Sequence, residues 1–126
     1  MFSCDWSEWP LVTLRFSEAF RVEDETLYLD SIQRLADARE PYAVILVTQG
    51  DEHLSQKAKV RNNMIFKHNR DHFTRYCRQF YRVKTDVDWA EIDDTKLKKA
   101  MPFPAAHAPS EEVARRLALA VLAAAR

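Results

Sequence analysis

The chain has 126 residues, of which 47% are apolar and 30% charged, and its 19 basic and 19 acidic residues give a formal net charge of zero. This length fits a single domain over residues 1–126 with an N-terminal arm at 1–8, and the aromatic content excludes a chain that is disordered throughout. No apolar run approaches the roughly 18 residues of a membrane span, and two cysteines cannot build a disulfide framework, so we expect a cytoplasmic protein without a membrane partner.

The first half of the chain predicts two strands with a helix between them. Apolar residues after Pro10 predict a strand at 11–16. Asp24 is expected to be the N-cap of the following helix, which Pro41 terminates. The run Tyr42–Val47 is apolar without alternation, which is typical of a strand buried on both faces in the centre of a parallel sheet.

The middle of the chain predicts one long helix, over residues 55–80, with apolar side chains on one side and basic ones on the other. Asn62 and Asn69 fall within the apolar stripe, where they would hydrogen-bond to the backbone of a neighbouring element. A third strand is expected at residues 81–84.

The last third predicts a short helix near 94–101, a weak strand at 103–107 whose proline favours a sheet edge, and a final helix that Ser110 caps. This alternation predicts an α/β fold, with a small, mostly parallel four-stranded sheet and helices packed on it. The expected core face of the final helix is Val113, Leu117, Ala120, Val121 and Ala124.

The single glycine, Gly50, restricts the chemistry that the chain can support. Loops that cradle phosphates need several glycines, and the Gly-x-Ser-x-Gly turn of a serine hydrolase is absent. Adjacent carboxylates at 93–94 and 111–112 point apart on a helix, which does not suit an acid–base pair. The sequence therefore favours a non-catalytic protein without a cofactor.

Four segments carry a family resemblance through their order and patterning: PYAVILVTQG, KAKVRNNMIFKHNRDHFTRYCRQF, YRV and MPFPAAHAPSEEVARRLA. Over most of residues 9–122 the chain resembles small bacterial SpoIIAA-like proteins, relatives of the STAS domain, the anti-sigma-factor antagonist fold. The resemblance implies a SpoIIAA-like or STAS-like sheet and a regulatory, protein-binding role.

Family members that are switched by phosphorylation carry a Ser or Thr after a central strand, in an Asp-Ser-Ser-Gly-like context. The corresponding junction here reads TQGDEHLSQKAK, and that context is absent. The resemblance therefore leaves Ser55 as the nearest candidate phosphoacceptor.

The zero net charge conceals an uneven distribution along the chain. Residues 1–52 carry a net charge of −7, residues 53–84 one of +8 and residues 85–126 one of −1. The zero total argues against a dedicated polyanion binder, whereas the asymmetry favours association with another surface.

The outer, basic face of the long predicted helix is the first candidate site. Val60 and Met64 are apolar but fall among the charges there, a pattern typical of interfaces. We expect this face to contact another protein or a second copy of the chain, whose acidic segment 18–40 could oppose it. Pairing of the two segments within one molecule is the alternative. The predicted contact residues are Val60, Arg61, Met64, Lys67 and Arg75.

Two other functions are alternatives. Open α/β sheets bind ligands at the carboxyl ends of their strands, which predicts a pocket for a small ligand or substrate at Gln49, Asp51 and His53. The basic helix with its interleaved aromatic residues is also compatible with weak nucleic-acid binding through residues 56–80. Because those aromatic residues fall opposite the charges, they are more typical of a core, and nucleic acid is the less favoured partner.

His68 and His72 are four residues apart on the predicted helix, which is the spacing of two metal ligands. A site would need a third ligand, and only His53 or His107 could supply another imidazole. Solvated histidines at the helix edge are the favoured interpretation, so we expect no metal.

Cys77 lies close in sequence to Arg75 and Arg78, whose charges would lower the pKa of its thiol and make it reactive. It also borders the apolar stripe, where a cysteine usually acts as a small buried hydrophobe. The second interpretation is favoured because no other cysteine lies near it in the sequence.

Overall fold

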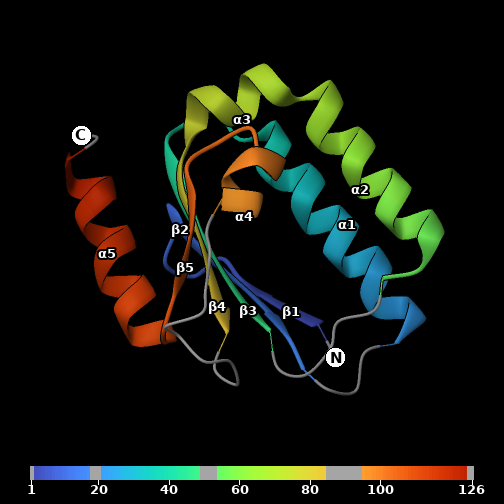
Figure 1. Ribbon diagram of the computed structural model, residues 1–126, viewed down its shortest axis with the longest axis horizontal. Helices are drawn as coiled ribbons and strands as arrows, with labels where there is room; N and C mark the ends of the chain where they lie inside the picture. Colours follow the sequence, from blue (N-terminus) through green and yellow to red (C-terminus); the bar gives the residue numbers. More distant parts are fainter. Residues whose placement is uncertain (1, 18–20, 49–53, 85–94, 125–126) are drawn as a thin grey trace.

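The computed structural model describes residues 2–17, 21–48, 54–84 and 95–124 (Figure 1). The predicted strand at 11–16 and the short helix near 94–101 are confirmed. In chain order the elements are β1 (Phe2–Asp5), β2 (Leu11–Phe16), α1 (Val22–Asp37), β3 (Tyr42–Thr48), α2 (Gln56–His68), α3 (Arg70–Tyr76), β4 (Cys77–Lys84), α4 (Thr95–Ala100), β5 (Ala105–Ala108) and α5 (Glu111–Ala124).

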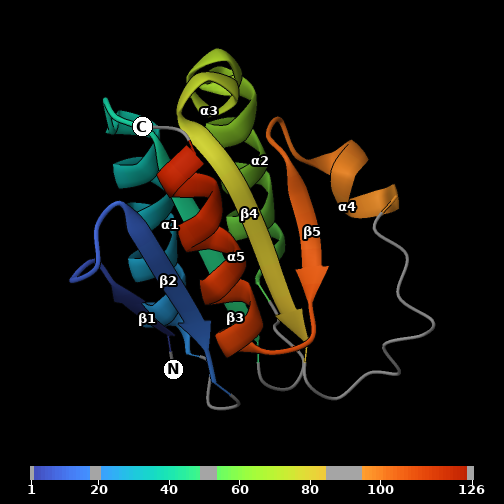
Figure 2. The same ribbon diagram turned by 90° about the vertical axis from the view of Figure 1, so that its left-hand side faces the viewer.

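The strands form one sheet in the order β1-β2-β3-β4-β5, with β1 antiparallel to β2 and the later neighbours parallel. Figures 1 and 2 show α1, α2 and α3 on one face of the sheet and α5 on the other. The α/β class and the mostly parallel sheet are therefore confirmed, as is the edge position of β5. The expected number of four strands is wrong, because the predicted arm at 1–8 contains β1.

β1 escaped the sequence patterns because it is only four residues long and buries only its first side chain. The ring of Phe2 packs on Phe16 with the two centroids 4.9 Å apart, and the Phe2 N–H donates to Oδ1 of Asp24 at 3.0 Å. These contacts are with residues distant in sequence, and they hold the strand at the edge of the sheet.

Asp24 has a different role from the predicted N-cap. The helix begins at Val22 with Arg21 as its N-cap, and Oδ2 of Asp24 accepts the Arg21 N–H at 2.7 Å. The backbone hydrogen bonds from Phe2 and Arg21 hold the pKa of Asp24 below its usual value. Asp24 thus fastens β1 to the first turn of α1. The helix itself ends at Asp37, before Pro41.

Two cores lie on opposite faces of the sheet. The strand β3 is buried along its whole length, as predicted, and contributes to both. One core packs the sheet against α1, α2, α3 and α4, and it contains most of the aromatic side chains. The other is smaller and packs the sheet against α5.

The predicted single helix over 55–80 is wrong in two places. It is interrupted at Asn69, whose φ of −114° and ψ of 23° are not helical and whose side-chain amide donates to the carbonyl oxygen of Ile65 at 2.9 Å. Asparagine competes with backbone hydrogen bonds in this way, which weakens a helix locally. Helix then ends at Tyr76, because Cys77 pairs with Tyr42 and starts β4.

The predicted core face of α5 is also wrong. Ser110 does cap the helix, with its Oγ accepting the Val113 N–H at 3.2 Å. The buried side chains are instead Ala114, Ala118 and Leu122, while Leu117 is 41% exposed. Small residues let the helix axis lie close to the sheet, so the alanine stripe faces inward and the larger side chains flank it.

Among the described residues, no helix has the length and the apolar character that a membrane span requires.

Candidate interaction surface

The helix α2 is attached to the rest of the molecule mainly through α1. Within the helix itself Ala58 is buried, and the hydroxyl of Tyr28 on α1 donates to Oδ1 of Asn62 at 3.1 Å. The N–H of Ser55, just before α2, donates to Oε1 of Glu25 at 2.6 Å. The helices α1 and α2, which belong to the acidic and the basic segment, therefore lie side by side in one molecule (Figures 1 and 2). The prediction that Asn62 and Asn69 hydrogen-bond to the backbone of a neighbouring element is wrong. Asn62 accepts a hydrogen bond from the side chain of Tyr28, and Asn69 donates one to the carbonyl oxygen of Ile65 in the helix that precedes it.

We use the term basic face for the outward side of α2 that carries Val60, Arg61, Met64 and Lys67. All four side chains are exposed, and those of Val60 and Met64 are 48% and 50% exposed. Positions 60, 64 and 67 follow one another at helical spacing, so they share a side of the helix. The structure therefore brings together four of the five predicted contact residues.

Arg75 does not belong to the basic face. It lies on α3, where its guanidinium is 5.3 Å from the ring centroid of Tyr76, and it lines a shallow groove with Asp37, Arg39 and His72. The prediction grouped it with α2 because it assumed one continuous helix.

The cations of the basic face have no ion-pair partner within the described part of the chain. Two ion pairs of the described residues, Arg15–Glu111 and Glu8–Arg115, instead join the N-terminal region to the start of α5. Among the residues that the structure describes, packing of α1 beside α2 therefore gives the cations of the basic face no salt bridge. This distribution leaves a positive surface around two apolar side chains.

Ser55 is the N-cap of α2. Its Oγ accepts the Ala58 N–H at 3.1 Å and donates to Oε2 of Glu25 at 3.0 Å. A phosphate on this oxygen would lie beside the Glu25 carboxylate and repel it. The hydroxyl thus has a structural role, whereas its phosphorylation stays a prediction.

Replacing Ser55 by alanine should lower the free energy of unfolding by about 1 kcal/mol, because the N-cap hydrogen bond and the link to Glu25 are both lost. Urea denaturation followed by circular dichroism measures this change. Gln56→Ala, at the next exposed position, is the control and should change stability by less than about 0.5 kcal/mol. Equal stability of the two variants would contradict the capping role.

The alternative pocket at Gln49, Asp51 and His53 lies outside the described residues. His68 is exposed, and His72 is partly buried, with Nε2 donating to the carbonyl oxygen of Leu35 at 3.2 Å. The second nitrogen of His72, Nδ1, is 3.1 Å from a guanidinium nitrogen of Arg39. Burial lowers the pKa of His72, and both ring nitrogens already have partners.

Cys77 is buried beneath the α1–α4 layer, and burial raises the pKa of its thiol. The guanidinium-bearing side chains of Arg75 and Arg78 are exposed, so they do not share its environment. The thiol therefore packs as a small hydrophobe. Phe73, Phe80 and Tyr81 are likewise buried. This agrees with the interpretation that the aromatic residues interleaved with the basic ones belong to the core.

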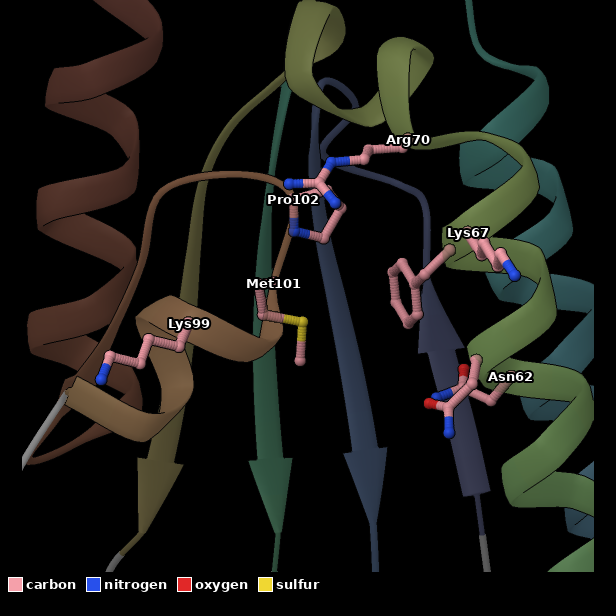
Figure 3. Close-up of a pocket in the computed structure, with 8 residues that line it drawn as sticks. Asn62, Lys67, Arg70, Lys99, Met101 and Pro102 are labelled. Atoms are coloured by element: carbon pink, nitrogen blue, oxygen red, sulfur yellow. The ribbon is translucent and has the colours of Figure 1, made fainter.

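A groove of about 350 Å³ separates α2 from the segment that begins with α4 (Figure 3). Sequence reasoning missed it because its two walls are about thirty positions apart in the chain and meet only through the crossover from β4 to β5. The one available signal was Asn62, a polar residue within an apolar stripe. The groove is lined by Asn62, Asn63, Phe66, Lys67, Arg70, Lys99, Met101 and Pro102.

The fold and these surfaces define a small α/β protein with a five-stranded mixed sheet. Comparison with protein-family models, with curated proteins and with solved structures gives no match for this chain. Its function must therefore be argued from the exposed face of α2 and from the groove beside it.

Proposed function

We propose that the chain is a non-catalytic protein-interaction or regulatory module of STAS-like type, which contacts its partner through the basic face. One observation carries this proposal. Val60 and Met64 remain about half exposed on a helix whose cations have no ion-pair partner in the described part of the chain. Exposed apolar groups with a charged rim are typical of surfaces that become buried on association.

The STAS-like assignment is supported by the order of elements. A short antiparallel strand is followed by parallel strands that alternate with helices, and a last helix lies on the opposite face of the sheet. This order agrees with the patterning by which residues 9–122 resemble the SpoIIAA-like group. Fold alone does not define an activity, so the role of the module rests on the basic face.

The partner should present acidic side chains around an apolar group. The outer side of α1 has this character, because Leu27 is 53% exposed and lies between the exposed Glu23 and Asp30. A second copy of the chain could therefore satisfy the basic face, as could an acidic surface on a different protein. Charge complementarity of this kind steers association and fixes orientation.

Photo-crosslinking tests the proposal. Benzoylphenylalanine at position 64 should yield a defined adduct, whereas the same group in place of the 43% exposed Leu119 on α5 should not. Adducts of purified protein would identify a second copy, and adducts found only in host extract would identify another protein.

Charge reversal separates specific contact from adventitious labelling. Arg61→Glu with Lys67→Glu should remove the adduct at position 64, because it replaces attraction with repulsion. Arg116→Glu, an exposed change on α5, is the matched control and should leave it intact. Adducts of equal yield at positions 64 and 119, or an adduct that survives the reversal, would contradict the proposal.

A further inference from the structure

The groove between α2 and α4 is a second candidate site, distinct from the basic face. In Figure 3 the side chains of Asn62 and Met101 point into it, and Arg70 and Pro102 line it at one end. Lys67 and Lys99 line its rim but extend away from it in opposite directions. The groove is therefore apolar in the middle, and the side chains of Asn62 and Arg70 place hydrogen-bond donors at its wall and at its end.

The apolar wall is held in place by an aromatic cluster. Phe66 lines the groove, and its ring centroid is 5.0 Å from that of Phe73 and 5.9 Å from that of Phe103. Phe73 and Phe103 also contact each other at 5.7 Å, and both are buried. A ring packed from behind in this way presents a fixed flat surface, and the thioether of Met101 adapts to what lies against it.

The donors are oriented by the same packing. Oδ1 of Asn62 accepts the Tyr28 hydroxyl, so its Nδ2 is left to donate into the groove. Arg70 carries only donors and has no ion pair in the part of the chain that the structure describes. The lining residues include three cations and no carboxylate. Such a set of groups attracts an anion and repels a cation.

We propose that this groove binds a small planar organic anion. Its ring would lie between Phe66 and Met101, and its carboxylate or phosphate group would accept hydrogen bonds from Arg70, which suits a planar, bidentate contact. Asn62 would donate to a polar atom on the ring. The volume of about 350 Å³ falls near the lower end of the roughly 300–1,000 Å³ of small-molecule sites, which fits a ligand of one or two rings.

This site does not depend on the proposed protein-interaction role. Residues 62, 63 and 66 of α2 face the groove, whereas 60, 61 and 64 face outward, and only Lys67 borders both surfaces. One side of the helix can therefore bind a ligand while the other remains available to a partner.

Titration of the ¹⁵N-labelled protein by NMR tests the proposal with benzoate and phenyl phosphate as probes. Either probe should shift the amide signals of Phe66 and Met101 and the side-chain amide of Asn62. It should bind about tenfold tighter than phenol or inorganic phosphate, because each of these supplies only half of the contacts. The tighter of the two anionic probes identifies carboxylate or phosphate as the preferred group.

Arg70→Gln should weaken the anionic probes about tenfold and leave phenol binding unchanged. Lys57→Gln, which removes an exposed cation of α2 outside the groove, is the matched control and should leave all probes unchanged. Both positions are exposed, and the spectra themselves report whether each variant is folded. Any of three results would overturn the proposal. Inorganic phosphate could bind as tightly as phenyl phosphate, the NMR shifts could spread along the basic face, or Arg70→Gln and Lys57→Gln could weaken the anionic probes equally. If no specific adduct forms at position 64 of the otherwise unchanged protein while probe binding is intact, only the proposed function is contradicted.

Discussion

Phe73→Ala is expected to lower the free energy of unfolding by about 3–5 kcal/mol, the largest effect of any single change considered for this protein. Phe73 is 2% exposed, and its ring contacts Phe66 from α2 and Phe103 from the segment before β5. Truncation would therefore remove a buried ring and leave a cavity where α3, α2 and the sheet meet. Denaturation in guanidinium chloride, followed by circular dichroism, measures the loss.

The conservative change Phe73→Leu is the control, because it keeps an apolar side chain in the same space. It should cost clearly less than Phe73→Ala, since most of the buried volume is retained. Phe73→Ala should also weaken phenyl phosphate binding in the groove, because the Phe66 ring loses its support. A destabilisation below about 1 kcal/mol would show that this cluster does not hold α2 and α3 on the sheet.

The segment around β4 shows why helical periodicity predicts a helix where the chain forms a strand. Cys77 and Phe80 are three apart and both enter the core beneath α1–α4, as they would on a helix. In the structure Tyr42 pairs with Cys77 and Ala43 with Gln79, so Arg78 is an extra residue in β4. Such a bulge changes which side of the strand the following residues face. The bulge gives the buried residues of β4 the spacing of a helix turn, so only the long-range pairing with β3 distinguishes this strand from a helix.

Local signals succeeded where the structure depends on near neighbours. The uninterrupted apolar run of β3 predicted a central buried strand, and Ser110 predicted the start of α5. The exposed group Val60, Arg61 and Met64 was predictable for the same reason, since their spacing on α2 is set within the helix.

The groove could not be found in this way. Its walls combine residues 62–70 with residues 99–102, and their proximity arises from the crossover that places α4 near β5. The donor at Asn62 is likewise set by Tyr28, which lies 34 residues earlier. No local pattern contains that information, because both contacts depend on how the helices pack on the sheet.

The packing of α5 leads to the second prediction with a large effect, Ala118→Leu, which should destabilise the protein by about 1–3 kcal/mol. Ala118 and Ala114 are fully buried where α5 lies against the sheet, so a larger side chain would push the helix outward. Leu117→Ala, at the neighbouring position, should cost less than about 1 kcal/mol because that side chain is 41% exposed. Thermal and urea denaturation of the two variants in parallel measures the difference.

The sequence pattern alone predicts the opposite order, because it places Leu117 in the core and leaves Ala118 outside it. If Leu117→Ala were the more destabilising change, α5 would have to be rotated about its axis relative to the sheet. That rotation would also move Arg115 and Glu111, whose ion pairs with Glu8 and Arg15 join α5 to the N-terminal region. The alanine stripe and these two ion pairs are therefore a joint test of which side of α5 faces the sheet.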